Sequence, residues 1–293
     1  MTAQVVAQLA VNGLAAGALY ALVALGLVLT YKATEVLNFA HGDMLMLAAF
    51  VGWGLTGPAG LPFWLALPLT ALIAALLGYA IDALVMRRIV GQPQFAGVML
   101  TIALAFMLRG AVSMGFGAES RSLATPFSAN TTVLPGGVVI ADLTLVILGV
   151  ALAATAALLV FLRHAPLGVA MQAASQNQLA AYLNGIPVKR VVALTGALAG
   201  VLAALAGVLI APFTLVDTSL WFVMLKALAA LVLGGFGSIA GAIVGGLLIG
   251  QIEQWAGVLG PDGSKDVVAH VVLISVLVLR PRGLLGEAHG RRV

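Results

Sequence analysis

Residues 163–190 read RHAPLGVAMQAASQNQLAAYLNGIPVKR, and this polar segment separates two long apolar runs. Apolar and small residues recur in it at intervals of three, four and seven, which predicts an amphipathic helix over 167–185. Pro166 and Pro187 bracket the helix, and basic residues flank it on both sides. Because a basic loop between membrane spans is expected in the cytoplasm, we predict a short cytoplasmic helix here. Its apolar face includes Leu167, Met171 and Gly185.

This helix has two possible neighbours, the lipid headgroups or another protein. Interfacial helices hold a membrane with Trp, Phe and Leu side chains. The apolar face of this helix is mostly alanine. We therefore favour docking into a partner protein, and binding to lipid is the alternative.

The composition excludes a soluble domain. Hydrophobic residues make up 62% of the 293 residues and charged residues only 8%, whereas about a quarter of the residues of a globular protein are charged. The apolar runs are unbroken and the chain has 35 glycines, which favours packed helices over the alternating strands of a barrel. The absence of cysteine excludes disulfides, thiol catalysis and thiolate metal sites.

The apolar runs predict an all-α bundle that spans a membrane about eight to nine times and forms a single domain over 1–293. The N-terminal run lacks the basic start of a secretory signal, so we expect it to stay as the first span. A crossing needs about 20 helical residues. The run 223–236 is short and 39–55 follows a polar residue, so one or both could be broken or re-entrant. The other runs are 61–86, 95–115, 139–162, 191–212, 239–255 and 267–279.

The basic residues predict the orientation. If the N-terminus is outside, only Arg121 and Lys265 fall in outside loops. Because loops that stay in the cytoplasm are rich in Lys and Arg, we expect the C-terminus there as well. The net charge of +4 then reflects orientation and not nucleic-acid binding. The inside loops hold Lys32, Arg87, Arg88, Arg163, Lys189, Arg190, Arg280, Arg282, Arg291 and Arg292.

A glycine-rich run, LVLGGFGSIAGAIVGGLLIG, covers residues 231–250. Gly241 and Gly245 are four residues apart and predict a flat face for close helix packing. The run is not a nucleotide-binding P-loop, because GxxxxGK[ST] is absent. A helix break that lines a polar cavity is possible just before this face. The residues that would form the break are Gly234, Gly235, Gly237 and Ser238.

The stretch NFAHGD places polar side chains at the start of an apolar run. An unpaired aspartate in the centre of a membrane costs about 2.5 kcal/mol or more, so these groups must be paired, hydrated or at the surface. One interpretation is a gate or pathway element near the cytoplasmic mouth, and the other is a capped helix start. The residues concerned are Asn38, Phe39, His41, Gly42 and Asp43.

Three further charged residues lie in or beside apolar runs, namely Arg109, Lys226 and Glu253. We expect each to extend its charged group to the membrane surface.

No Ser/His/Asp set or His/carboxylate cluster stands out, and the four histidines are scattered. We therefore expect neither an enzyme nor a metal or cofactor bound by this chain.

Several stretches together resemble the permease subunits of bacterial ABC importers for branched-chain amino acids, the hydrophobic amino acid uptake family, and are nearer to the H-type than to the M-type subunit. They cover nearly the whole chain. NFAHGD and LGGFGSIAGAIVGG are the most specific of them. The stretches are GALYALVALGLVLTYKATEVLNFAHGDMLMLAAF (17–50), PLGVAMQAASQNQLAAYLNGIPVKRV (166–191), ALAGVLAALAGVL (197–209), KALAALVLGGFGSIAGAIVGGLLIG (226–250) and RPRGLLG (280–286).

The resemblance implies a bacterial inner-membrane permease with a second, related permease subunit as its partner, in a heterodimer. It also implies two cytoplasmic ATPases, which would hold ATP and Mg²⁺, and an extracytoplasmic solute-binding protein. The 167–185 helix would be the coupling helix that docks on an ATPase. Relatives often carry an arginine at Gln172, so the resemblance implies the docking but not the family's salt bridges. The loop pattern is matched by Gly168, Ala173, Ala180 and Gly185.

Two alternatives to a branched-chain amino acid importer stay open. Permeases for urea and short amides are similar to this family, so the substrate is less certain than the assignment to an ABC importer. A secondary transporter or channel would need no ATPase. Ion-coupled carriers usually keep ionisable residues in mid-membrane, and no acidic residue sits clearly at the centre of an apolar run here, which disfavours that class.

Overall fold

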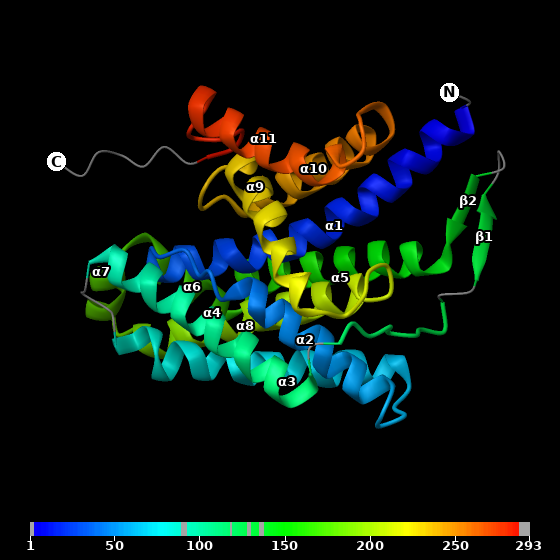
Figure 1. Ribbon diagram of the computed structural model, residues 1–293. Helices are drawn as coiled ribbons and strands as arrows, with labels where there is room; N and C mark the ends of the chain where they lie inside the picture. The colour runs from blue at the N-terminus through cyan, green and yellow to red at the C-terminus, as the bar shows by residue number, and fades with distance from the viewer. Residues whose placement is uncertain (1–2, 89–92, 118, 128–129, 135–137, 287–293) are drawn as a thin grey trace.

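The computed structural model describes residues 3–88, 93–117, 119–127, 130–134 and 138–286, and it shows a helical bundle (Figure 1). Short helices lie at one end, called the loop end, and a β-hairpin lies at the other, called the hairpin end. The elements are α1 (Ala3–Thr34), α2 (His41–Thr56), α3 (Phe63–Leu84), η1 (Met86–Arg88), α4 (Gln94–Phe116), β1 (Thr131–Leu134), β2 (Val138–Ala141), α5 (Asp142–His164), α6 (Pro166–Gln176), α7 (Gln178–Leu183), α8 (Val188–Ile210), η2 (Thr218–Phe222), α9 (Val223–Gly234), α10 (Ile239–Leu259) and α11 (Ser264–Leu279).

The predicted all-α fold is confirmed. In the described part of the chain the one named sheet is the antiparallel hairpin β1–β2, in which Thr131 pairs with Ala141. Six helices are long and apolar enough to span a membrane: α1, α3 with η1, α4, α5, α8 and α10. Helices α2, α9 and α11 are shorter, with 16, 12 and 16 residues. The count of eight to nine spans therefore stays a prediction.

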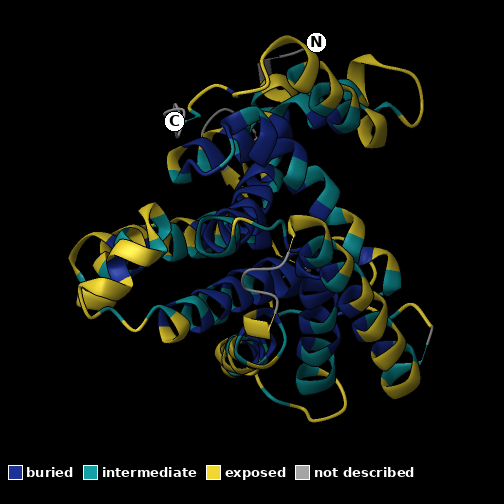
Figure 2. Ribbon diagram, turned by 90° about the vertical axis from the view of Figure 1, so that its left-hand side faces the viewer, coloured by how far each residue is buried: buried dark blue, intermediate teal, exposed yellow. Residues whose placement is uncertain are grey.

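Burial separates inner from outer helices. In the most apolar part of α1, 89% of the residues are buried, against 22% in α5. Figure 2 shows the buried residues along the inner helices and exposed residues on the outer ones. The outer faces carry large apolar side chains, such as Phe106 and Met107 on α4 and Leu152 on α5. Such faces require an apolar solvent or an apolar partner, which fits a multi-pass membrane protein.

The chain turns back into the bundle after α1. The carbonyl of Leu37 accepts a hydrogen bond from the Thr101 hydroxyl on α4 at 3.4 Å. His41, the first residue of α2, lies against Gly26 of α1. Gly26 is eight residues before the end of α1, which corresponds to about 12 Å along the helix. Helix α2 therefore begins inside the bundle, as a re-entrant segment does.

Helix α9 also begins inside the bundle, but it is approached from the hairpin end. A side chain on Gly42 of α2 would meet the Trp221 carbonyl at 2.7 Å and the Met224 Cβ at 2.8 Å. The starts of α2 and α9 thus pack on each other. The two runs that could be broken or re-entrant are both short helices, and their first turns meet in the interior. This arrangement is typical of transporters with discontinuous helices.

Glycines let α10 pack closely between α9 and α1. Gly241 lies on Gly234, and Gly245 lies on the Ala230 carbonyl of α9. On the other side of α10, Gly246 lies on Ala21 and Gly250 on Gly17 of α1. Each of these positions leaves no room for a Cβ. Close backbone contact of this kind replaces the hydrophobic effect as the source of helix association in lipid.

Gly245→Ala should destabilise the protein, because its Cβ would overlap the Ala230 carbonyl and approach the Gly234 nitrogen to 3.0 Å. Overpacking of this kind costs about 1–3 kcal/mol. The matched control is Gly149→Ala on α5, where nothing lies within 4 Å of the new Cβ. The measurement is the thermal unfolding midpoint in detergent, which should fall for the first variant and not for the second. A Gly245→Ala midpoint at or above that of the wild type would contradict this packing.

The closing segment 280–286 covers the break between α9 and α10. The Leu284 N–H donates to the Leu233 carbonyl and the Leu285 N–H donates to the Gly234 carbonyl, both at 2.8 Å. These bonds pair carbonyls at the C-terminal end of α9, which have no partner within the helix. Gly235 (φ +112) and Gly283 (φ +69) adopt left-handed backbone conformations where the two segments touch. Side chains there would be strained and would separate the segments.

Candidate functional site

The loop 163–190 contains two helices and not the single helix expected over 167–185. Helix α6 ends at Gln176 and α7 begins at Gln178. Asn177 separates them because its backbone is extended (φ −156, ψ 104). Its side-chain oxygen accepts the Ala180 N–H at 2.9 Å and so caps α7. Gly185, which was expected in the helix, lies beyond α7 with φ +83.

The two helices bury mostly small residues and expose most of their larger ones. Gly168 and Met171 are buried, and Gly168 lies on the backbone of Phe161 and Leu162 in α5. Ala173 is half-buried, and Ala180 is exposed. The apolar face that the sequence predicts is mostly alanine, and this holds only for the buried and half-buried residues of the two helices. The exposed large apolar residues of the two helices are together called the loop patch, and they are Leu167, Val169, Leu179, Tyr182 and Leu183.

Hydrogen bonds attach α6 and α7 to the membrane helices. The Gln172 side-chain amide donates to the Leu162 carbonyl of α5 at 3.0 Å. The Gln178 side-chain amide donates to the Ala33 carbonyl of α1 at 2.7 Å. These bonds connect α6 to α5 and α7 to α1.

The NFAHGD motif lies inside the bundle and not at its mouth. Asn38 is buried, and its side chain accepts the Ala40 N–H at 3.0 Å. His41 is fully buried, and both its ring nitrogens lack a hydrogen-bond partner. Phe39 is half-buried against the core. Asn38 therefore shapes the turn before α2, but no side chain caps the helix itself. The pathway role of the motif stays a prediction.

Asp43 forms a buried ion pair with Arg109 of α4. The Arg109 Nε lies 3.0 Å from one Asp43 oxygen, and Nη2 lies 3.2 Å from the other. The guanidinium also lies 4.4 Å from the centre of the Trp221 ring. The expectation that Arg109 extends to the membrane surface is wrong, because a carboxylate and an aromatic face satisfy it inside. The pair and the ring contact tie α4 to the first turn of α2 and to η2, which precedes α9.

A second charged network lies toward the hairpin end. The Lys226 ammonium is 2.8 Å from Glu253 of α10 and 3.0 Å from Asp266 of α11. The Tyr20 hydroxyl of α1 donates to the other Glu253 oxygen at 2.5 Å. The side chains of Lys226 and Glu253 are only 17% and 2% exposed. The expected extension of both to the surface is therefore wrong, and the network joins α1, α9, α10 and α11.

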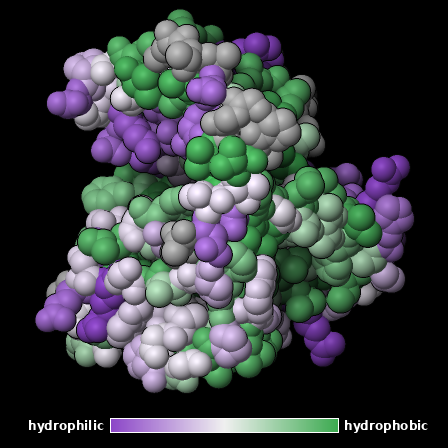
Figure 3. Space-filling view, turned by 90° about the vertical axis from the view of Figure 1, so that its right-hand side faces the viewer, coloured by the Kyte–Doolittle hydropathy of each residue, from purple (hydrophilic) through white to green (hydrophobic). Residues whose placement is uncertain are grey.

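This network lines a cavity of about 620 Å³, called the hairpin-end cavity. Asp217 and Lys265 add further charges to its wall, and Phe213 and Leu220 add apolar surface. Figure 3 shows the hairpin end, where hydrophilic residues lie among hydrophobic ones. The sequence marks Lys226 and Glu253 singly, as charges in apolar runs, but does not indicate that they belong to one network.

The glycine break lies at the loop end. Gly237 and Ser238 line a cavity of about 880 Å³ together with Tyr31 and Met171. The Ser238 hydroxyl accepts the Gly241 N–H at 3.0 Å and caps α10. Gly234 and Gly235 lie instead under the closing segment. Of the four residues predicted to form the break, only Gly237 and Ser238 therefore line this cavity.

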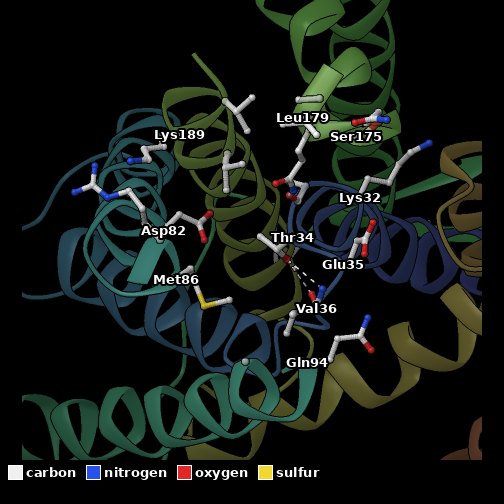
Figure 4. A pocket seen from close by; sticks show the side chains of 18 of the residues that line it. Lys32, Thr34, Glu35, Val36, Asp82, Met86, Gln94, Ser175, Leu179 and Lys189 are labelled. Atoms are coloured by element: carbon white, nitrogen blue, oxygen red, sulfur yellow. Dashed lines mark hydrogen bonds between the residues drawn. The ribbon is translucent and has the colours of Figure 1, made fainter. Parts of the chain in front are cut away.

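A third cavity, of about 670 Å³, lies between the ends of α1 and α3 and the starts of α4 and α8 (Figure 4). The junction of α6 and α7 also borders it. Its wall includes Asp82 of α3, which the sequence analysis did not single out. The described residues hold no group of three or more His, Cys, Asp or Glu side chains that could bind a metal ion.

Comparison with known proteins assigns the family. Residues 9–277 match the model of a family described as the permease component of branched-chain amino acid transport systems. The high-affinity branched-chain amino acid transport permease BraD of Pseudomonas aeruginosa is 31% identical over 97% of this chain and 96% of its own length. The LivH permease of Escherichia coli is 31% identical over 96% of both chains.

A solved structure supports the fold alone. The chain described as PsaBC from Streptococcus pneumoniae in complex with Fab is 15% identical, with a TM-score of 0.50 over 92% of this chain and 91% of that one. The match to the family model and to full-length relatives, together with apolar helices long enough to span a membrane, agrees with the resemblance of the sequence motifs. The chain belongs to the family of permease components of branched-chain amino acid ABC transport systems.

Proposed function

We propose that this chain forms half of the translocation pathway of an ABC importer that moves branched-chain or related amino acids into the cytoplasm. ATP is hydrolysed by two separate ATPase subunits, and this chain is itself not an enzyme and binds no cofactor. The observation that carries the proposal is the loop patch. It presents five large apolar side chains on two short helices fastened to α1 and α5.

The loop patch fits a groove on a partner protein better than water. Leu179, Tyr182 and Leu183 are 69%, 67% and 75% exposed. An amphipathic helix that lays such side chains into a hydrophobic groove is a recurring mode of recognition. The loop patch has larger apolar side chains than the alanine-rich face that the sequence predicts, so binding to lipid stays as the alternative. The anchoring of the loop to α1 and α5 favours an ATPase, because movement of a docked ATPase would be transmitted.

The charges support a cytoplasmic loop end. The chain order brings the ends of α1, η1 and α5 and the start of α8 to this end, and with them most of the basic residues. Arg280 and Arg282 follow α11 at the same end, beside the α9–α10 break. Arg291 and Arg292 lie outside the described residues. Arg121 and Lys265 lie at the hairpin end. This bias supports a proposed orientation with the N-terminus outside and the C-terminus in the cytoplasm of a bacterial inner membrane.

Single cysteines test this orientation, since the chain has none of its own. Cysteines at Gly60 and Gly263, both open positions in turns, should react with an impermeant maleimide added outside intact cells. A cysteine at Gln176, which is exposed at the loop end, should react only after the membrane is opened. Labelling of Gln176→Cys from outside would reverse the orientation.

Two further partners are proposed, a solute-binding protein and a second permease subunit. A solute-binding protein would dock at the hairpin end and deliver its ligand to the hairpin-end cavity, where Lys226 and Asp217 lie near apolar Phe213 and Leu220. Charged groups of both signs beside apolar surface suit an amino acid with an apolar side chain better than urea. A second, related permease would cover the outward faces of some outer helices, as a heterodimer, and lipid the others.

A secondary transporter is the second candidate, because Asp43 and Glu253 are buried ionisable groups that the sequence analysis did not place inside the bundle. Both are paired with cations, which favours a structural role.

Proteoliposomes separate the two functions. The chain, reconstituted with its second permease, ATPases and binding protein, should take up leucine only when ATP and the binding protein are both present. Uptake without either of them would overturn the importer. A preference of the binding protein for urea or amides over leucine and valine would change the proposed substrate but not the proposal that the chain belongs to an ABC importer.

A further inference from the structure

Asp82 is a buried carboxylate that has no partner among the residues that the structure describes. It lies in the last turn of α3, and it is 5% exposed. Its side chain packs against Gly196 of α8, where any Cβ would collide with it. Among the described residues it takes part in no hydrogen bond or ion pair, whereas Asp43 and Glu253 each have a cation. A carboxylate buried in this way is costly unless something positive or hydrogen-bonding reaches it.

The cavity of about 670 Å³ described above gives access to Asp82 and is called the Asp82 cavity. In Figure 4 Asp82 and Lys189 lie on one side of the cavity, and Lys32 and Glu35 lie on the other. Arg87 also belongs to the wall. Apolar surface comes from Val36, Met86, Leu179 and Val192. Its volume is within the roughly 300–1,000 Å³ typical of small-molecule sites.

The charges on this wall select the chemistry of a ligand. The unpaired carboxylate suits an ammonium group, and Lys189 and Arg87, which form no ion pair within the described residues, suit a carboxylate. An inorganic cation would need several oxygen ligands and would meet these two cations. A simple anion would meet the carboxylate. A zwitterion satisfies both signs, and the apolar wall suits an aliphatic side chain.

We propose that the Asp82 cavity binds an apolar α-amino acid at the loop end, with its ammonium group on Asp82 and its carboxylate on Lys189. This inference rests on the proposed function, which supplies such an amino acid on that side of the membrane. The site is distinct from the hairpin-end cavity, at the opposite end of the bundle.

The position of the Asp82 cavity gives the site a regulatory role. Its wall includes the α6–α7 junction from Ala174 to Leu179. Asn177 makes this junction a break in the helix, and Gln178 fastens it to α1. A bound amino acid would contact both α3 and the junction and would hold the loop patch in one position. The transported amino acid would thereby slow the ATPases as it accumulates inside.

Binding of leucine to the assembled transporter, without binding protein and without ATP, tests the site. Radiolabelled leucine should bind saturably in equilibrium dialysis. Asp82→Asn should weaken this binding about tenfold or more, the loss expected for one charge-assisted contact. Lys189→Met, at an exposed position, should weaken it as well. Arg190→Met is the matched control, because Arg190 is the exposed neighbour that does not line the cavity.

Leucine fragments sharpen the assignment. Unlabelled 4-methylpentanoate has the side chain and carboxylate of leucine but no ammonium group, so it should fail to displace leucine. Displacement as strong as that by leucine would overturn the role of Asp82. Equal binding by wild type and Asp82→Asn, or no saturable binding by wild type, would overturn the site and leave Asp82 simply buried and protonated.

Regulation is tested in proteoliposomes whose ATPases face the bath. Leucine added to the bath should slow ATP hydrolysis in the wild type and in Arg190→Met, and not in Asp82→Asn. Unchanged hydrolysis in the wild type would overturn the feedback. Vesicles of the same preparation whose ATPases face the lumen should take up leucine, and this uptake reports the proposed function separately. If no amino acid is taken up, that function fails, while the dialysis experiment still decides whether the cavity binds leucine.

Discussion

Leu183→Glu should abolish ATP-driven uptake and leave the permease inserted in the membrane. Leu183 is the most exposed residue of the loop patch, at 75%. A glutamate there changes no membrane helix and makes no clash within the chain. In a docked complex it would bury an unpaired charge in an apolar contact. Such a change at the centre of an interface costs about 2 kcal/mol or more, which weakens binding more than tenfold.

The measurement is co-purification of the tagged permease with its ATPases, together with uptake in cells. The control is Val133→Glu on β1, an equally apolar and 64% exposed position at the other end of the molecule. It should not change co-purification. If Leu183→Glu retains its ATPases and transports normally, the loop patch lies in lipid or water. The family would then stand, but the assignment of this patch as the ATPase contact would be lost.

Arg109→Met should cause the largest loss of stability of any single change proposed. It leaves the Asp43 carboxylate, which is 1% exposed, without its cation at the meeting point of α2, α4 and η2. Removing one partner of a buried ion pair costs about 3–5 kcal/mol. The thermal unfolding midpoint in detergent and the amount of protein in the membrane should both fall. Arg190→Met, which removes an exposed arginine, should leave both unchanged.

The double variant Asp43→Asn with Arg109→Met separates the charge from the fold. Replacing both charges of a buried pair is often nearly neutral, so the double variant should recover much of the lost stability. Asp43→Asn alone should cost less than Arg109→Met, because the guanidinium keeps the Trp221 ring and is 25% exposed. A double variant as unstable as Arg109→Met would show that Arg109 acts through its packing and not through the pair.

Local pattern carried much of the fold. The boundaries of α3, α4 and α10 lie close to those predicted from hydropathy. A segment in lipid must hydrogen-bond its own backbone as a helix, and its side chains must be apolar, so a membrane helix is visible in the sequence as an apolar run. The glycine run indicated a possible break before α10, and Gly235 and Gly237 adopt left-handed conformations there. The loop 163–190 was less predictable. Its period of three and four suggested one helix, and a single Asn177 cap divides it into two.

The sequence by itself determined the class of the protein, an all-α membrane permease of a known family, since composition, apolar runs and motifs are properties of the chain alone. Only the tertiary structure decided what the charged residues do. Arg109 meets Asp43 across 66 positions, Lys226 meets Glu253 across 27, and Asp82 meets no partner among the described residues. Hydropathy shows that a charge in an apolar run needs a partner. Which residue supplies that partner depends on how the helices pack, and two broken helices that begin inside the bundle set that packing.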